Sequence, residues 1–346
     1  MKVEIRFSGL LYILILFFLA SCSPEQFSPR SDNRLLLGTV CVISLDKSEP
    51  VELFDQAFDI IAQEEQLMSL QVPDSDLSKV NRSAGVSAVK VSPDTLEVLG
   101  AALNYASMSG GAFDPSIAPL VELWGIVTGD AVSPPDPLEI EPVRSLTDYT
   151  KVLIDDKSET VFLENKGMKV DLGAIAKGYV GDRVKDFLLS QGVERGIINL
   201  GGNIVVIGSK PGNEPWKIGI QNPFDNRGRH IGLVSVSDST VVTSGIYERF
   251  FMYEGKRYHH ILDPWTGYPV DNELASVSII AEKSMDADAL STSLFVLGID
   301  KGLQLIENIN GAEAIFVTKE KEIVLSSGAG DFFELKDNGF TIISQR

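Results

Sequence analysis

The chain has 346 residues, and 44% of them are hydrophobic, so it can bury a large core in one sizeable domain or in two closely joined ones. Its 48 acidic and 30 basic residues give a formal net charge of -18. This sign excludes a protein that binds nucleic acid through its general field, so no nucleic acid partner is expected. Any polyphosphate ligand must be held by local lysines, helix amides or a metal.

The first 21 residues have the pattern of a bacterial lipoprotein signal peptide. A short basic start (Lys2, Arg6) precedes an apolar run over residues 10–19, which is too short to span a membrane comfortably as a stable helix. Small residues then precede Cys22. We predict cleavage before Cys22 and acylation of this residue, which would anchor the protein to a membrane. An ordinary membrane anchor with an incidental cysteine is the alternative.

Residues 22–34 are rich in serine, proline and charge and are predicted to be a flexible tether. The folded domain is expected to begin near Leu35 and to cover residues 35–346. Cys41 is then the only cysteine besides the acylated one, which excludes an internal disulfide. Because Cys41 stands among apolar residues, we interpret it as a small buried hydrophobic side chain and not as a nucleophile.

Apolar periodicity predicts a mixture of helices and strands in the first half of the domain. Ser92 and Pro93 suit the N-cap and the first position of a helix that runs to Gly110. The next segment, Gly111-Ala112-Phe113-Asp114-Pro115, suits a loop that faces a ligand, although a plain turn is the commoner explanation. The other elements expected here are a strand over 35–44, a helix over 51–70, a polar connection over 68–81, and strands over 151–155, 160–163 and 168–170.

The stretch Asp171–Tyr179 joins the run 168–170 to an amphipathic helix. A glycine at such a junction, Gly173, lets the backbone come close to a ligand, and free amides at the start of a helix suit an anion. Asp171 and Lys177 would lie at the mouth of this site. A glycine turn with a solvated lysine is the alternative.

Strands dominate the second half of the domain, and a glycine pair bends the first two of them at Gly201-Gly202-Asn203. A helix is expected to begin at the cap Ser284 and to end at Gly298, with Ala287, Leu290 and Leu294 on its core face. The expected strands cover 196–200, 204–208, 216–220, 231–236, 239–243, 249–253 and 257–262.

Asp288 and Thr292 are four residues apart in this last helix, so their oxygens project from the same face near its start. A carboxylate and a hydroxyl, with no nearby histidine or thiol, suit a hard cation such as Mg²⁺ that keeps waters and is completed by substrate phosphates. An acidic first turn that complements the helix dipole is the alternative.

Together these segments resemble the ApbE family, the FAD:protein FMN transferases of the bacterial envelope. The family implies an α+β fold of the T-fold-like type, in two closely joined halves with FAD in the cleft between them. The segments that carry the resemblance cover nearly the whole mature chain in the family's order; they are Gly38-Thr39, 68–81, 111–115, 171–179, 201–203, Thr243-Ser244-Gly245, 260–269 and 288–292.

The resemblance also implies roles for single residues. Mg²⁺ would be held by the carbonyl of Ala174 and by the side chains of Asp288 and Thr292. Lys177 and His260 would be catalytic, since His260 matches the histidine proposed to help deprotonate the acceptor hydroxyl. The FAD contacts would come from Leu37, Gln71, Ala112, Phe113, Asp114, Asp171, Lys177 and Leu262.

General chemistry agrees with these roles. Cleavage of a pyrophosphate needs the charge on its oxygens to be neutralised, which a metal, Lys177 and helix amides can supply. A threonine hydroxyl is a poor nucleophile at neutral pH, and a neutral histidine can take its proton. His260 has an alternative role, in which it only orients Asp263 or packs beneath the loop.

Gln71 departs from the family pattern, because many members carry a tyrosine over the flavin nucleotide at this position. Loss of an aromatic ring weakens stacking and can admit water. The balance between transfer of FMN to a protein and hydrolysis of FAD therefore stays open at the level of sequence.

Three functions follow as hypotheses. The first is Mg²⁺-dependent transfer of FMN from FAD to a threonine of an exported or membrane redox protein, with release of AMP. The second is a periplasmic FAD pyrophosphatase that yields FMN and AMP. The third is a lipoprotein that binds FAD without chemistry, against which the intact Lys177, Asp288 and Thr292 argue. The expected location is the cell envelope, through a lipid anchor, on the periplasmic face of the inner membrane.

Overall fold

The structure, a computed structural model, describes residues 28–343 and has an α+β fold. Its largest part is a nine-stranded sheet in the order β1-β2-β6-β7-β10-β13-β14-β15-β17, in which only β15 and β17 pair in parallel. The strands are β1 (Pro29–Leu36), β2 (Thr39–Asp46), β6 (Gly196–Leu200), β7 (Asn203–Ile207), β10 (Thr240–Gly245), β13 (Leu274–Ala281), β14 (Ala312–Thr318), β15 (Glu322–Leu325) and β17 (Thr341–Ile342).

Three small sheets and seven α-helices complete the described fold. The small sheets are β3-β5-β4 (Val89–Lys90, Thr160–Leu163, Val152–Asp155), β11-β12 (Phe250–Tyr253, Lys256–His259) and β16-β9-β8 (Phe333–Leu335, His230–Val236, Trp216–Gln221). The helices are α1 (Glu52–Met68), α2 (Asp76–Arg82), α3 (Pro93–Met108), α4 (Ala118–Trp124), α5 (Pro137–Arg144), α6 (Ala176–Ser190) and α7 (Ser284–Ile306).

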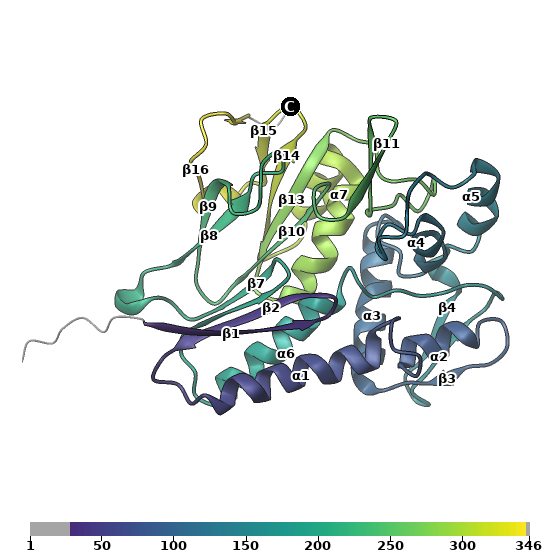
Figure 1. The fold of residues 1–346 in the computed structure, drawn as a ribbon, viewed down its shortest axis with the longest axis horizontal. Coiled ribbons are helices and arrows are strands. Elements are labelled where there is room, and N and C mark those ends of the chain that lie inside the picture. The colour runs from purple at the N-terminus through teal and green to yellow at the C-terminus, as the bar shows by residue number, and fades with distance from the viewer. Residues whose placement is uncertain (1–27, 344–346) are drawn as a thin grey trace, which may run out of the picture.

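The two faces of the large sheet pack against different partners. In β14, Ala314 and Phe316 are buried in a cluster with residues of α7, whereas Ile315 and Val317 are buried with residues of β8 and β9. Alternate side chains of a strand point to opposite faces, so one short sequence serves two cores. Figure 1 shows the result, with α6 and α7 on one side of the sheet and β8, β9 and β16 on the other.

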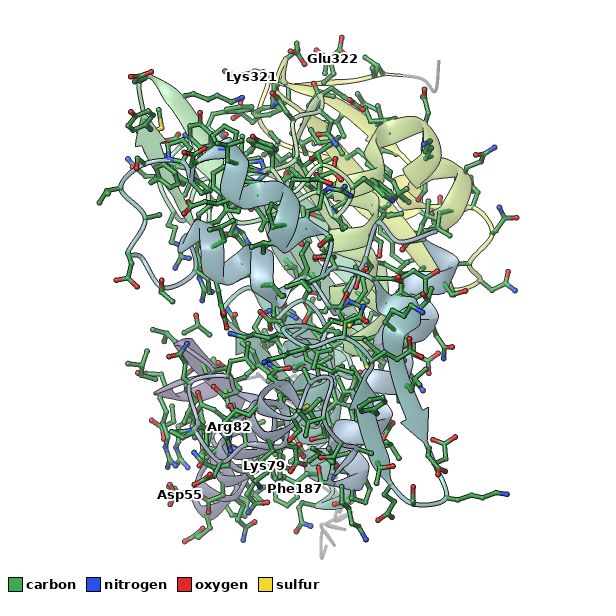
Figure 2. The ribbon with its side chains drawn as sticks, turned by 90° about the vertical axis from the view of Figure 1, so that its right-hand side faces the viewer. Asp55, Lys79, Arg82, Phe187, Lys321 and Glu322 are labelled. Carbon is green, nitrogen blue, oxygen red and sulfur yellow. The ribbon has the colours of Figure 1, made fainter. Side chains whose placement is uncertain are left out.

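Charged side chains lie at both ends of the molecule (Figure 2). Asp55 of α1 and Lys79 and Arg82 of α2 are at one end, and Lys321 and Glu322 of the β14–β15 turn are at the other. In Figure 2, α1 and α2 lie at the bottom and the β14–β15 turn lies at the top.

Helices α6 and α7 approach one another more closely than any side chain would allow. A Cβ atom at Gly178 would lie 2.2 Å from the carbonyl oxygen of Ser284, and one at Gly181 would lie 3.0 Å from Val205. Glycine at position 178 therefore lets the start of α6 cross directly over the start of α7, and Gly181 lets the same helix pack closely on β7. The residues that flank the crossing, Lys177 and Asp288, are thereby brought together.

Many of the elements predicted from sequence are confirmed. The helix predicted from Ser92 is α3, and the Ser92 hydroxyl accepts a hydrogen bond from the amide of Thr95 at 3.2 Å, as an N-cap does. Cys41 is fully buried among apolar residues of β2, α1 and α6, and burial raises its pKa to about 11. Its thiol is therefore un-ionised at neutral pH, as a structural cysteine requires.

The predicted limit of the tether is wrong. Residues 29–34 belong to β1, which pairs with β2 in antiparallel register from Pro29 opposite Asp46 to Leu36 opposite Thr39. The strand lies at the edge of the sheet and most of its side chains are exposed, so its serine and charge are compatible with a strand as well as with a linker. The signal peptide and Cys22 lie outside the described residues.

Other elements also differ from the prediction. The single strand expected over 35–44 is divided by a turn at Leu37 and Gly38, so its residues belong to β1 and to β2. Residues 168–170 form no strand; they carry one isolated bridge between Lys169 and Ile117. Ser284 is the first residue of α7 and makes no side-chain cap. Gly298 does not end α7 but breaks it, with φ of 76°, and the helix resumes and runs to Ile306 because its later apolar residues still reach the core.

Helix α7 is also, within residues 28–343, the one helix that is long and apolar enough by composition to cross a membrane. Its side chains explain this composition without a membrane. Ala287, Leu290, Leu294 and Phe295 are fully buried in the core beneath β10 and β13. The helix is apolar because it is the central helix of the fold.

We predict that Gly178→Ala lowers the free energy of unfolding by about 1–3 kcal/mol, because the new methyl group forces α6 away from Ser284. The matched control is Gly100→Ala in α3, where no atom lies within 4 Å of the added carbon. This control should be neutral or stabilising by about 0.5–1 kcal/mol. Urea unfolding of the two variants gives both values. Equal effects would show that the α6–α7 crossing is not tight.

Candidate functional site

The loop before α6 is folded around its own polar groups. The carboxylate of Asp171 accepts a hydrogen bond from the amide of Gly173 at 2.7 Å, and the Lys177 ammonium donates to the carbonyl of Gly173 at 2.8 Å. The amide of Asp171 donates to the carbonyl of Pro115 at 2.8 Å. The loop 111–115 and the stretch 171–179 are therefore in direct contact, as a shared site requires.

Asp288 joins this group from α7. Its Oδ2 atom accepts a hydrogen bond from the amide of Gly178 at 3.0 Å and lies 3.7 Å from the Lys177 ammonium. Gly178 is the third residue of α6, so its amide has no acceptor within the helix. Asp288 is 4% exposed, so the amide at the helix start and the nearby lysine supply the polar contacts that a buried carboxylate needs.

A second carboxylate makes the reverse contact. Asp182 of α6 accepts hydrogen bonds from the amides of Ser284 and Met285, at 2.8 and 2.9 Å, where α7 begins. Burial raises the pKa of Asp182 to about 6, although these two hydrogen bonds oppose the rise. Each helix therefore caps the start of the other, and the pair fixes Asp288 relative to Lys177.

Thr292 lies one turn after Asp288, beside a hydroxyl from the large sheet. The hydroxyl of Ser244 in β10 lies 2.8 Å from that of Ser291 and 3.4 Å from that of Thr292. Thr292 thus faces the strand that contains Thr243-Ser244-Gly245, whereas Asp288 faces α6. The structure brings the two segments together from positions far apart in the chain.

Asp114 is buried at the end of the loop 111–114, where three hydrogen bonds hold its carboxylate. Its carboxylate accepts hydrogen bonds from the Ser116 amide at 2.8 Å, the Ser116 hydroxyl at 2.6 Å and the Tyr149 amide at 3.2 Å. Burial raises the pKa of Asp114, and these hydrogen bonds oppose the rise. Asp114 therefore orders the loop, which leaves contact with a ligand to the backbone and to neighbouring residues. At Gly111, with φ of 92°, an added Cβ would lie 3.8 Å from the indole nitrogen of Trp265.

His260 and Arg249 approach the site from the β11–β12 hairpin. The Nδ1 atom of His260 lies 3.2 Å from the carbonyl oxygen of Arg249, and part of the histidine reaches solvent. Its enclosure by protein, and then the charges of Arg249 and Lys177, lower the pKa of His260 to about 4. The imidazole is therefore neutral at pH 7, the form that can accept a proton.

Asp171 is close to the same cations. Enclosure by the surrounding protein raises the pKa of its carboxyl group, while the Gly173 amide, Lys177 and Arg249 oppose the rise. Sequence reasoning missed Arg249, which follows the Thr243-Ser244-Gly245 segment without a motif of its own. Its guanidinium also lies 4.0 Å from the position of a Cβ at Gly38. The β1–β2 turn is thereby linked to the site.

The remaining candidate residues take different positions. Leu37 has a positive φ of 54° in the β1–β2 turn, and its amide donates to Glu65 at 2.8 Å. Ala174, in the loop before α6, is partly exposed. Leu262 is 5% exposed and pairs with Pro269, so its side chain belongs to the core. Gln71 is exposed in the turn after α1.

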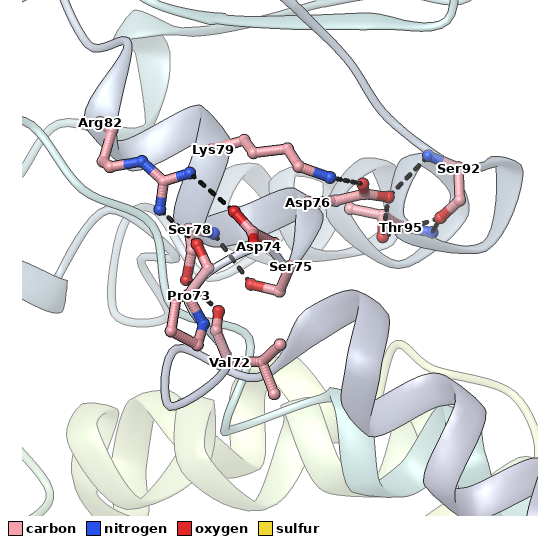
Figure 3. A network of polar contacts seen from close by, with 10 residues as sticks. All are labelled: Val72, Pro73, Asp74, Ser75, Asp76, Ser78, Lys79, Arg82, Ser92 and Thr95. Atoms are coloured by element: carbon pink, nitrogen blue, oxygen red, sulfur yellow. Dashed lines mark hydrogen bonds and ion pairs between the residues drawn. The ribbon is translucent and has the colours of Figure 1, made fainter.

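Figure 3 shows the polar network that fixes the segment 68–81. Asp76 accepts hydrogen bonds from the Ser92 amide at 2.7 Å and the Thr95 hydroxyl at 3.1 Å, which ties the start of α2 to the start of α3. At the end of the segment, the Asn81 side chain donates to the carbonyl of Val170 at 3.0 Å and accepts from its amide at 2.7 Å. The segment thus supports the chain immediately before Asp171.

Helix α6 is held from its far side as well. Arg183 lies 3.7 Å from Glu64 of α1 and 3.8 Å from Asp94 of α3, and the Tyr179 hydroxyl lies 2.5 Å from Asp94. Glu64 is 4% exposed, and burial, with the charge of Asp94, raises its pKa to about 7. These polar contacts fix the rotation of α6 and hence the direction of Lys177.

The residues present fit a hard cation better than a soft one. Within residues 28–343 no group of three His, Cys, Asp or Glu side chains could hold a metal ion. A metal here would depend on mixed oxygen donors, which are the carboxylate of Asp288, the hydroxyl of Thr292, the carbonyl of Ala174 and the oxygens of a substrate. This oxygen-only, incomplete set is the kind that Mg²⁺ uses with phosphates.

The fold and the site together define a class of protein: an α+β protein with a lysine and a carboxylate at a helix crossing, suited to binding a phosphate-containing ligand. The ApbE family matches residues 37–316. The chain belongs to the ApbE family. The predicted α+β fold of this family is thereby confirmed.

Known relatives cover nearly all of the chain. It is 40% identical to the FAD:protein FMN transferase of Klebsiella pneumoniae (strain 342), over 90% of this chain and 98% of the relative. It is 35% identical to the FAD:protein FMN transferase of Treponema pallidum (strain Nichols), over 95% and 96%. The crystal structure of the ApbE protein from Thermotoga maritima has a TM-score of 0.81 and 34% identity and covers 88% of this chain and 99% of that one.

We predict that the imidazole of His260 titrates near pH 4 and not near the ordinary value of 6.5. The protonation of each histidine is followed by NMR of the ring C–H resonances, and His260→Asn identifies the signal. Because the unfolded chain binds this proton near pH 6.5 and the folded chain only near pH 4, acidification through that range should favour unfolding. A midpoint near 6.5 for the assigned signal would contradict the enclosed geometry.

Proposed function

We propose that this protein transfers FMN from FAD to a hydroxyl group of another protein and releases AMP. The observation that carries the proposal is the meeting of Lys177 and Asp288 at the α6–α7 crossing, one helix turn before Thr292, in a chain whose relatives are named FAD:protein FMN transferase. A protein that only carried FAD would not need a lysine paired with a buried carboxylate at this crossing. Both the enzyme class and the use of FAD follow from this assignment.

The reaction is a displacement at phosphorus. The oxygen of the acceptor hydroxyl attacks the FMN phosphorus of FAD, the bond from this phosphorus to the oxygen of the AMP phosphate breaks, and AMP leaves with the bonding electrons. Lys177 stabilises negative charge on the phosphate oxygens, and amides at the start of α6 add to this effect. We propose a threonine as the acceptor, on an exported or membrane redox protein.

The acceptor proton needs a base, and His260 is the proposed one. Its pKa near 4 keeps the imidazole neutral at pH 7, and Arg249 and Lys177 are close enough to act on it electrostatically. The same low pKa makes it a weak base, so positioning of the hydroxyl must contribute much of the rate. Asp171 and the loop Ala112–Asp114 are proposed to hold FAD, with Leu37, Gln71, Lys177 and Leu262.

Mg²⁺, held by Ala174, Asp288 and Thr292, is proposed as the metal of the site and would supply neutralisation of the pyrophosphate charge and orientation of its oxygens. The Lys177 ammonium lies 3.7 Å from Asp288, so the lysine and the carboxylate compensate each other's charge.

Hydrolysis of FAD to FMN and AMP is a second candidate function. The observation that favours it is the exposure of Gln71, which replaces the aromatic ring expected over the nucleotide. Water and the acceptor hydroxyl would attack the same phosphorus. The two functions are separated by the fate of the flavin, which is free FMN in one case and protein-bound FMN in the other.

We predict that Asp288→Asn lowers AMP release from FAD by about 10²-fold or more, because the variant keeps the shape of the side chain but loses its charge. The assay follows AMP, free FMN and acceptor-bound flavin separately, with Mg²⁺ present, after chelation by EDTA, and after Mg²⁺ is restored. EDTA should stop turnover of the wild type. His260→Asn in the same assay should slow transfer to the acceptor while FAD still binds.

Asp286→Asn is the matched control, since Asp286 is also in the first turn of α7 but is not part of the site. If both variants lose activity equally, the acidic first turn acts through the helix dipole and Asp288 is not a metal ligand. Full activity of Asp288→Asn at limiting Mg²⁺ would also reject the metal assignment.

We further propose that the mature protein is anchored in the bacterial cell envelope by acyl chains on Cys22, on the periplasmic face of the inner membrane. The support is the pattern of the first 22 residues. We predict that Cys22→Ser removes label from cells fed with labelled palmitate and leaves an uncleaved precursor, visible as a larger band in a denaturing gel. Label that persists in this variant would exclude lipidation at Cys22.

A further inference from the structure

A group of large apolar side chains is exposed on the β11–β12 hairpin and on the loop that follows it. The group consists of Phe250 (40% exposed), Met252 (55%), Tyr253 (38%), Trp265 (49%) and Tyr268 (39%), and we call it the hairpin patch. Alternation along β11 puts Phe250 and Met252 on the face of the hairpin opposite Phe251, while Tyr268 lies against Trp124 on the other face. A single exposed apolar residue needs no explanation, but five on one hairpin and the loop that follows it favour a contact region around the hairpin. Aromatic residues and methionine are also the types that interfaces favour.

The hairpin patch stands on a fixed base. The ring of Phe251 stacks on Tyr258 at 5.2 Å between ring centres, and Tyr258 stacks on the buried Trp124 at 5.8 Å. The indole nitrogen of Trp124 donates to the carbonyl of Gly267 at 2.8 Å, which ties the following loop to the same base. An exposed apolar surface with this support is already organised to meet a partner, so little entropy is lost when it does.

The patch borders the candidate site on two sides. Phe250 follows Arg249 directly, and the amide of His260 donates to the carbonyl of Arg249 at 3.1 Å. Trp265 lies against Gly111, at the start of the loop proposed to contact FAD. A molecule that covers the patch therefore reaches His260 from the hairpin and the loop 111–114 from Trp265.

The hairpin also offers free backbone groups. Strands β11 and β12 pair with each other from Phe250 opposite His259 to Tyr253 opposite Lys256, and within residues 28–343 they pair with no further strand. The outer edges of such a ribbon can accept an extended segment of another chain. Figure 1 shows β11 standing out beyond α4 at the upper edge of the molecule, where another chain can reach it.

The size of the expected partner favours a protein. Under the proposed function, the acceptor hydroxyl belongs to a polypeptide that must reach the FMN phosphorus beside His260. A specific protein–protein contact covers about 800 Å² on each partner, a circle with a radius of roughly 16 Å. Met252 is only three residues along a strand from Arg249, roughly 10 Å, so it falls inside that circle.

We propose that the hairpin patch is the docking surface for the protein that accepts the flavin, and that it holds an extended segment next to the accepting hydroxyl. This inference rests on the proposed transferase function and adds a second, separate requirement to it. The patch selects the acceptor, whereas Lys177, Asp288 and the loop 111–114 bind FAD. The partner is a polypeptide with apolar side chains near its acceptor residue.

Two variants test the proposal, Met252→Ser and Trp265→Ser, with Val86→Ser as the control. Val86 is 76% exposed and follows α2, which lies at the lower edge of Figure 1, far from β11. The probe is a membrane extract of cells that lack this protein, incubated with FAD, Mg²⁺ and each purified variant. Covalent flavin is read by fluorescence in a denaturing gel, and AMP release without extract is measured in parallel.

We expect flavin incorporation at limiting extract to fall about tenfold in Met252→Ser and in Trp265→Ser and to stay unchanged in Val86→Ser. AMP release without extract, and the affinity for FAD from quenching of flavin fluorescence, should stay within about twofold of wild type. Circular dichroism verifies that all three variants are folded, which exposed positions should permit. Loss of a merely structural residue would lower both flavin incorporation and the affinity for FAD. A loss of incorporation alone therefore distinguishes a docking role from a structural one.

Five results would overturn the proposal. Unchanged incorporation in both patch variants would show that the acceptor docks elsewhere, and an equal loss of FAD affinity would assign the patch to the FAD site. A change in oligomeric state, or loss of binding to lipid vesicles, with normal incorporation would assign it to a second copy or to a membrane. If wild type releases AMP but labels no protein, the transferase function fails together with this inference.

Discussion

The crossing of α6 over α7 is the contact on which the site depends. At Gly178 there is no side chain to separate the two helices, and a carboxylate from each helix caps the start of the other. Neither helix has a side-chain cap of its own at its start, so the crossing supplies what each lacks. Asp288 is thus both a structural cap and the carboxylate nearest Lys177. A change at the crossing must affect stability and chemistry together.

The surrounding loops are fixed by polar groups that are satisfied within the fold. Asp114 orders the loop 111–114, and Asn81 brackets the backbone of Val170 from both sides. These residues hold the backbone of the loops in place through their own side chains. Hydrogen bonds within the fold thus surround a small number of polar groups that stay free. This order lowers the entropic cost of organising the site when FAD binds.

Helix starts that depend on residues close together in the chain were predicted correctly from the sequence. The start of α3 at Pro93 and the helix that follows the Asp171 loop are local events, decided by caps and periodicity, and both are confirmed. Asp182 and Arg249 were missed because their partners are distant in the chain; Asp182 bonds to residues 102 and 103 positions away. The predicted tether, residues 22–34, is too long because an exposed edge strand and a linker have similar compositions. Family resemblance, not spacing, supplied His260 and Gln71.

The edge strand β1 has a further consequence, for reach. The ordered sheet begins at Pro29, so if acyl chains are attached at Cys22, the intervening chain spans at most about 25 Å even when fully extended. The short linker would then keep the domain close to the membrane surface. Its partners would be proteins whose acceptor residue lies within about one domain diameter of the lipid. A protein that diffuses freely in the same compartment would have to approach the membrane surface to be modified.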